Sequence, residues 1–198
     1  MKALRTVLLA LGLLTPFVGN LAGQDLVENV TNELGSAEWI WSPAHTKNDI
    51  PVGACYFRKT FDLAEPDIGE VQITADNEFE LFVNGKQVGG GKDWRQLEVF
   101  EISTHLVKGR NSVAILVRNT DQGTAGLVGR VLVREKSGTY VSHPTNASWK
   151  TSVREYLDWT AAEFADQEWV NAKSYGVLGL ALPWGNEVVI AGVGVRFN

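Results

Sequence analysis

The residues with the clearest chemical potential lie around one predicted hairpin, residues 74–94. A sugar is commonly held by an aromatic ring against its C–H face and by planar polar groups that bond its hydroxyls. Both kinds of group lie near the two ends of this stretch, where the residues are Asp76, Asn77, Asp93 and Trp94. The aromatic residue, Trp94, follows a run of three glycines. Two further polar residues, at the end of a later strand, join this candidate ligand-binding set: Arg118 and Asn119. The pattern favours a carbohydrate-binding site.

Each member of this set also has a structural interpretation. Asp76 and Asn77 fit a polar turn at the start of a strand, because their short side chains bond nearby backbone groups. Trp94 can serve as a platform for a ligand or as an anchor for its own loop. An inward-facing Asn119 would satisfy the backbone of a loop. The sequence leaves these alternatives open.

Metal chemistry receives little support from the sequence. The three histidines stand in separate segments, and no His-x-His or Cys-x-x-Cys motif is present, which argues against zinc. A structural calcium ion stays open as a cofactor, because aspartate and asparagine oxygens are calcium ligands. Three residues could contribute such oxygens: Asp76, Asn77 and Asp121. No loop has a dense run of these ligands, so no metal site is assigned.

Catalysis is not expected. A glycosidase usually needs two carboxyl groups about 5 to 10 Å apart, one of them kept protonated by its surroundings. The acidic residues considered for this role stand in no context that predicts a shifted pKa: Glu98, Glu101, Asp158 and Glu163. The chain has no Gly-x-Ser-x-Gly motif, and its GGGK stretch lacks the spacing of a phosphate-binding loop.

The elements that must position these residues are predicted to be strands. From Trp39 onward, short runs rich in Val, Ile, Phe and Tyr alternate with turn residues, which is typical of an all-β domain. Asn84-Gly85 is the preferred pair for a two-residue hairpin turn, because both central positions need φ > 0. The strands expected are residues 55–63, 69–76, 78–83, 86–90, 96–102, 112–119, 126–135 and 187–197. The last of them must pair with a strand far back in the sequence.

Strands of unequal length with uneven connections fit two antiparallel sheets better than a barrel. The predicted fold is therefore all-β, a β-sandwich of jelly-roll type. One short helix is expected at residues 165–176, with Asp166 as its N-cap and Gly176 at its end. The single cysteine, Cys55, cannot form an intrachain disulfide and is expected to be buried. Six of the seven tryptophans, all except Trp94, are spaced like packing residues.

The start of the chain has the layout of a secretory signal peptide. Lys2 and Arg5 precede an apolar run at residues 7–18, and small residues follow up to Gly23. The run is shorter than the roughly 20 residues that a membrane-spanning helix needs. We therefore expect an exported protein, periplasmic or extracellular, without a membrane span. The expected organisation is a signal peptide at 1–23, a linker or short N-terminal segment at 24–37 and the jelly-roll domain at 38–198. A formal charge of −5 and the lack of a basic run argue against nucleic-acid binding.

A series of motifs in order resembles a known family. The motifs are EWIWSP (38–43), YFRKTFDL (56–63), ITADNEFELFVNGKQVG (73–89), GRNSVAILVRN (109–119), ASWKTS (147–152), EWVNA (168–172) and PWG (183–185). Together they resemble the galactose-binding-like jelly-roll domain at the N-terminal side of bacterial α-L-rhamnosidases, and similar modules of exported planctomycete proteins. The resemblance implies the sandwich fold and allows sugar, calcium or protein binding. The helical catalytic barrel of those enzymes is not expected, because the sequence extends only a few residues beyond the resemblance.

Two functions are therefore compared. The first is an exported, non-catalytic carbohydrate-binding module that recognises a glycan through one loop end, with Trp94 exposed in a polar groove. The second is a structural or protein-interaction domain with no sugar ligand. It would have Trp94 packed inward and an exposed apolar patch elsewhere, such as at residues 188–195.

Overall fold

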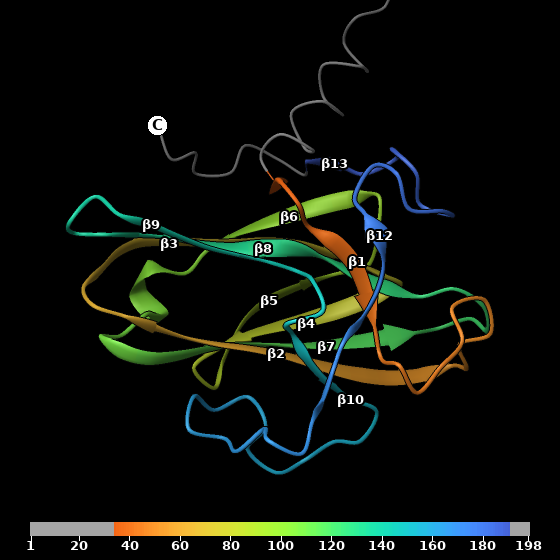
Figure 1. Cartoon of the computed structure of the whole chain (residues 1–198), viewed down its shortest axis with the longest axis horizontal. Coiled ribbons are helices and arrows are strands. Elements are labelled where there is room, and N and C mark those ends of the chain that lie inside the picture. The colour runs from red at the N-terminus through yellow and green to blue at the C-terminus, as the bar shows by residue number, and fades with distance from the viewer. Residues whose placement is uncertain (1–33, 191–198) are drawn as a thin grey trace, which may run out of the picture.

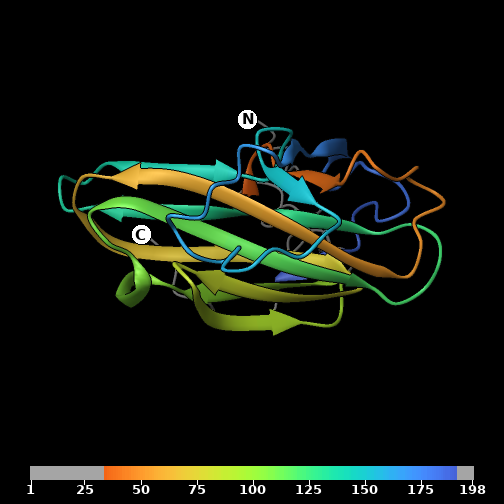
Figure 2. The ribbon, with the colours of Figure 1, turned by 90° about the horizontal axis from the view of Figure 1, so that it is seen from below.

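The computed structural model describes residues 34–190, which fold into two β-sheets packed face to face. Figure 1 shows the two layers, and Figure 2 shows the strands of one layer crossing over those of the other. The predicted sandwich of jelly-roll type is confirmed. The predicted signal peptide, most of the predicted linker and residues 191–198 lie outside the described residues. No helix within residues 34–190 is long and apolar enough to cross a membrane.

The first sheet has the strand order β12-β1-β8-β3-β6-β13, and β9 pairs with β8. Its strands are β1 (Glu38–Trp41), β3 (Pro66–Asp76), β6 (Gln96–Glu101), β8 (Gly126–Glu135), β9 (Tyr140–Pro144), β12 (Lys173–Val177) and β13 (Val189–Ile190). A 3₁₀ turn, η1 (Ser103–His105), follows β6. The described part of the predicted last strand, β13, pairs in parallel with β6, far back in the sequence as expected.

The second sheet has the order β11-β10-β2-β7-β4-β5. Its strands are β2 (Gly53–Leu63), β4 (Glu78–Val83), β5 (Lys86–Gly91), β7 (Gly109–Asn119), β10 (Lys150–Ser152) and β11 (Val170–Asn171). The turn between β4 and β5 has φ values of 50° at Asn84 and 83° at Gly85, so the predicted hairpin is confirmed. The main core lies between the two sheets, and on β4 the inward positions Phe79, Leu81 and Val83 alternate with less buried outward ones.

Irregular segments cover parts of both outer faces of the sandwich. Residues 178–188, the first-face cover, pack on the first sheet, where the Trp39 and Trp184 rings stack with centroids 4.1 Å apart. Residues 153–169, the second-face cover, pack on the second sheet, where Trp159 and Trp169 stack at 6.3 Å. The second-face cover is the loop at the bottom of Figure 1. The six tryptophans predicted to be packing residues are all buried.

The predicted helix at 165–176 is wrong. Its second half forms β11 and β12, which pair with β10 and β1 respectively. Trp169 N donates to Asp166 O in a turn that is not continued, and Ala172 N donates to Trp149 O in a distant segment. Pairing with two sheets has overridden a helical pattern too short to be stable by itself.

The core includes the single cysteine and residues that precede β1. Cys55 is fully buried, as predicted, and its Sγ lies 3.2 Å from Thr151 Oγ1; burial raises the pKa of the thiol to about 12. Leu34 and Ala37, at the described end of the predicted linker, are also buried and pack with Trp39. The ordered domain thus begins before residue 38.

Candidate functional site

The candidate site begins where the chain passes from the first sheet to the second. Asp76 is the last residue of β3 and Glu78 the first of β4, with Asn77 between them. Asn77 N donates to Arg118 O at 3.3 Å, and Asn77 Oδ1 accepts from Thr120 N at 2.8 Å. Asn77 therefore joins this crossing to the loop that follows β7, so both segments lie at one end of the sandwich.

The Asp76 carboxylate is buried and held by two donors. Only 8% of the residue is exposed. Trp184 Nε1 donates to Oδ2 at 2.9 Å, and Asn77 Nδ2 donates to Oδ1 at 2.9 Å. Trp184 comes from the first-face cover and is fixed by its stack on Trp39. The carboxylate is thus oriented by residues from both the loop end and the outer face.

This carboxylate has no counter-charge in contact. Within residues 34–190, no Lys, Arg or His nitrogen lies close enough to Asp76 to form an ion pair. Burial raises the pKa of Asp76, the Trp184 bond and the charge of Arg95 lower it, and the charge of Asp121 raises it. A buried anion without a cation is costly, and it is the kind of group that a ligand can stabilise.

Asp93 and Trp94 lie on the same side as Asp76. Thr74 Oγ1, from the strand that ends at Asp76, donates to Asp93 O at 3.3 Å. The Trp94 ring meets Trp39 edge to face at 6.5 Å, and the Arg95 guanidinium lies 4.6 Å from its centroid. Trp94 is half-buried, so one part of its ring anchors the loop and the other part faces solvent. Neither extreme expected from the sequence describes it.

The other two predicted site residues have different surroundings. Asn119 is buried, and its Nδ2 donates to Ile50 O at 3.1 Å and Pro51 O at 3.0 Å, so it satisfies a loop backbone. Arg118 lies on the outward side of β7 and pairs with Glu80, which points outward from β4. The structure therefore brings four of the six predicted residues together and directs the Arg118 side chain to the outer face of the second sheet.

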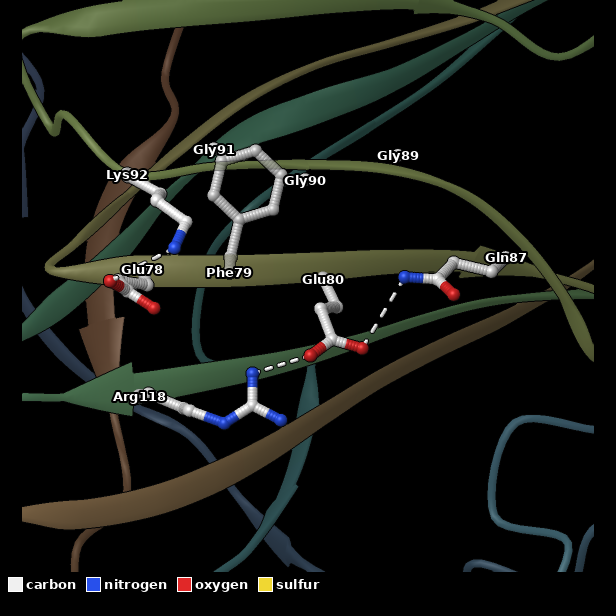
Figure 3. Close-up of a pocket in the computed structure, with 9 residues that line it drawn as sticks. All are labelled: Glu78, Phe79, Glu80, Gln87, Gly89, Gly90, Gly91, Lys92 and Arg118. Carbon is white, nitrogen blue, oxygen red and sulfur yellow. Dashed lines mark hydrogen bonds and ion pairs between the residues drawn. The ribbon is translucent and has the colours of Figure 1, made fainter.

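Arg118 lines a groove on that outer face, shown in Figure 3. The groove has a volume of about 310 Å³. Its lining consists of Glu78, Phe79, Glu80, Gln87, Gly89, Gly90, Gly91, Lys92 and Arg118. Apart from Arg118, its polar residues were not predicted to bind a ligand, although the alternation along 78–83 places Glu78 and Glu80 on one outward face.

Sequence reasoning also missed the role of Trp184. Trp184 was expected to be a packing residue, and its indole N–H proves to be a donor to Asp76, 108 positions away in the chain. No local pattern could have indicated this bond. For metals, the structure places no group of three His, Cys, Asp or Glu side chains together anywhere in residues 34–190. A calcium ion near Asp76 would have to take most of its ligands from amide and backbone oxygens.

Comparison with known proteins identifies similar chains. No protein-family model matches the sequence. An alpha-L-rhamnosidase of Streptomyces avermitilis is 30% identical over 167 residues, which cover 80% of this chain and 16% of the enzyme. The crystal structure of a Streptomyces avermitilis alpha-L-rhamnosidase complexed with L-rhamnose matches with a TM-score of 0.71 and 29% identity over 78% of this chain and 16% of that one.

A lectin from Pleurotus ostreatus is also similar. Its structure in complex with GalNAc matches with a TM-score of 0.74 and 30% identity, over 79% of this chain and 46% of the lectin chain. This chain thus spans less than half the length of each of these relatives. It resembles a galactose-binding-like carbohydrate-binding domain of the kind found in alpha-L-rhamnosidases.

Proposed function

We propose that this protein is an exported, non-catalytic carbohydrate-binding module and that its site is the loop end formed by Asp76, Asn77, Asp93 and Trp94. The observation that carries the proposal is the buried Asp76 carboxylate, which is oriented by Trp184 and Asn77 but has no cation beside it among the described residues. A hydroxyl donor, or a calcium ion that itself binds hydroxyls, would stabilise this charge.

The surroundings of Asp76 suit a sugar. A hydroxyl that donates to a carboxylate forms a charge-assisted bond, which is stronger than a bond between neutral groups. The half-exposed Trp94 ring, braced by Trp39, offers an apolar surface for the C–H face of the same sugar. A site with one rigid aromatic ring and a few converging polar groups is the usual composition of a small-molecule site.

The comparisons support a carbohydrate-binding role and suggest probes. The similar structures were determined with L-rhamnose and with GalNAc, so these two sugars are the first to test. The proposal that the domain is non-catalytic rests on the acidic residues. Glu98 and Glu101 stand three positions apart on β6, so the alternation of the strand directs them to opposite faces, and Asp158 and Glu163 lie in the irregular second-face cover. The proposal of export rests on the signal-like residues 1–23.

The test is isothermal titration calorimetry of the domain with L-rhamnose and with GalNAc, first with calcium chloride and then with EDTA. We expect saturable binding of at least one sugar and a loss of at least about tenfold in affinity, roughly 1.4 kcal/mol, in Asp76→Asn. Asp67→Asn is the matched control, because Asp67 is an exposed carboxylate paired with Arg134 in another part of the first sheet. Loss of binding in EDTA would assign calcium to the site. Equal affinity of Asp76→Asn and the wild type would overturn the proposed site.

A protein-interaction function is the second candidate, and one observation favours it. Leu180 and Leu182, both in the first-face cover, are 80% and 73% exposed. Of the apolar patch expected at 188–195, Val188 is buried, Val189 and Ile190 are partly buried, and residues 191–195 lie outside the described residues. If neither those sugars nor a glycan array gives a saturable signal, we expect a Leu180→Ser, Leu182→Ser double variant to lose a partner that the wild type captures.

A further inference from the structure

The groove of Figure 3 lies on the opposite outer face from Asp76. The Asp76 side chain lies on the outer face of the first sheet, where it contacts Trp184. Glu78, Glu80 and Arg118 point outward from the second sheet. The side chains of the two places thus point away from each other from different sheets, although Glu78 directly follows Asn77 and Lys92 directly precedes Asp93 in the chain. The groove is therefore a separate feature and not an extension of the Asp76 site.

The charges in the groove are balanced. Arg118 pairs with Glu80, and Lys92 Nζ lies 3.5 Å from Glu78 Oε1. Gln87 Nε2 donates to Glu80 Oε2 at 3.4 Å. With two carboxylates against two cations, the groove favours neither an anion nor a cation. It presents donors and acceptors in turn along its length, which suits an uncharged ligand whose hydroxyls both donate and accept.

These polar groups are free to exchange partners. The side chains of both pairs are partly or largely exposed, and exposed ion pairs contribute little to stability. A ligand hydroxyl can therefore replace one partner at little cost in stability. The planar groups of Glu80, Gln87 and Arg118 can each bond two adjacent hydroxyls of a sugar ring.

Glycines form the other wall of the groove. On β5, a Cβ at Gly89 or Gly91 would lie 2.2 Å from the Phe100 ring or 2.5 Å from the Phe79 ring, so the inward positions require glycine. A Cβ at Gly90, which pairs with Glu80, would lie 2.3 Å from Phe79 O. The strand therefore carries no side chains over this part of the groove. Glycine in a strand often marks such a close approach of backbone or ligand.

We infer that this groove is a second saccharide-binding site, so that one domain holds two glycan segments on opposite faces. The class of ligand, a saccharide, rests on the proposed function. The volume of the groove, about 310 Å³, lies at the lower end of the roughly 300–1,000 Å³ range of small-molecule sites. Two weak sites on one domain raise the overall affinity for a glycan-coated surface without any new contact.

The experiment is an NMR titration of the ¹⁵N-labelled domain with L-rhamnose and, separately, with GalNAc. The amides of Gly89, Gly90 and Gly91 report on the groove, and those of Asn77 and Thr120 report on the loop end. We expect at least one of the two sugars to shift both groups of signals. In Asp76→Asn, the loop-end shifts should disappear while the glycine shifts remain.

The groove variant is Glu80→Gln, which removes the charge paired with Arg118 but keeps the shape of the side chain. We expect it to weaken the glycine response about tenfold or more and to leave the loop-end response unchanged. Asp67→Asn, which breaks a comparable exposed pair with Arg134, should alter neither response. Glycine amides that stay unshifted at concentrations of L-rhamnose and GalNAc saturating the loop end would overturn the second site alone. Glycine shifts without loop-end shifts would overturn the proposed loop-end site alone, and silence in both groups would overturn both.

Discussion

The two outer faces of the sandwich are built alike, but they differ in whether a buried charged side chain has an ion-pair partner. Each is partly covered by an irregular segment, and each contains a stacked tryptophan pair. On the second face the buried charge is Arg58, whose Nε lies 3.1 Å from Asp166 Oδ2 and whose Nη1 donates to Trp159 O. The first face carries two buried carboxylates on β3, Glu70 and Asp76, and Asp76 has hydrogen-bond donors but no ion-pair partner among the described residues.

The difference indicates a structural role for Arg58 and supports a binding role for Asp76. A buried charge is tolerated when it is paired and bonded, and Arg58 meets this condition at Nε and Nη1 with groups of the second-face cover, while its Nη2 has no hydrogen-bond partner within residues 34–190. It therefore fixes that cover to the sheet. Asp76 meets the condition only in part, and its pKa is raised as a result. Local departures from good pairing tend to mark functional sites, which supports the proposed loop-end site on the Asp76 side.

The largest effect is expected from Asp166→Ala. The substitution leaves the fully buried Arg58 guanidinium without its anion, and breaking a buried pair typically costs about 3–5 kcal/mol. Urea unfolding at neutral pH measures this loss in the free energy of unfolding. Sugar binding at the loop end by the folded fraction should be unchanged, since Asp166 lies on the opposite outer face from Asp76. A loss below about 1 kcal/mol would mean that Arg58 does not depend on this pairing, and the contrast between the faces would fail.

An intermediate effect is expected from Trp184→Phe compared with Trp169→Phe. Both variants replace one indole of a stacked pair with a smaller ring. Only Trp184→Phe also removes a hydrogen bond, since Trp169 Nε1 has no hydrogen-bond partner within residues 34–190. A hydrogen bond to a charged group contributes about 1.5–3 kcal/mol, so Trp184→Phe should be less stable than Trp169→Phe by about that amount. Thermal and urea unfolding of the two variants give the difference. Equal stabilities would show that the Trp184 bond contributes nothing.

The smallest effect is a change in pH dependence in Asp76→Asn. Because the pKa of Asp76 is raised above 3.8 in the folded protein, the folded state takes up the proton more readily than the unfolded state. The wild type should therefore gain stability relative to Asp76→Asn as the pH falls through the raised pKa, and the gain should level off below the unfolded pKa of 3.8. Urea unfolding of both proteins from pH 7 to pH 3.5 tests this, and parallel curves would contradict it.

The long strands could be predicted because their signals are local. Residues 78–83 alternate with period two, and Asn84-Gly85 supplies the turn that closes their hairpin. The predicted strand at 126–135 matches β8, and the predicted strands at 55–63 and 112–119 lie within β2 and β7. The short strands could not be predicted in the same way. β11 has two residues, and its pairing with β10 is decided by packing and not by a pattern of its own.

The candidate site could be predicted only in part for the same reason. Asp76, Asn77, Asp93 and Trp94 are linked by one hairpin, so the sequence could group them. Trp184 reaches Asp76 from the first-face cover, and a contact of this range leaves no local signal. Arg118 was placed near the right turn, but the alternation of β7 directs its side chain to the opposite face.

The burial of Cys55 limits the reactivity of its thiol, which matters for a protein proposed to enter an oxidising compartment. Only the thiolate attacks disulfides, and a thiol with a pKa of about 12 is almost entirely protonated at neutral pH. Because the residue is also fully buried, the folded protein cannot cross-link to other chains through its one thiol. We expect the native domain to remain unmodified by an excess of a thiol-reactive dye until it is unfolded, which is a useful property for a protein proposed to be exported.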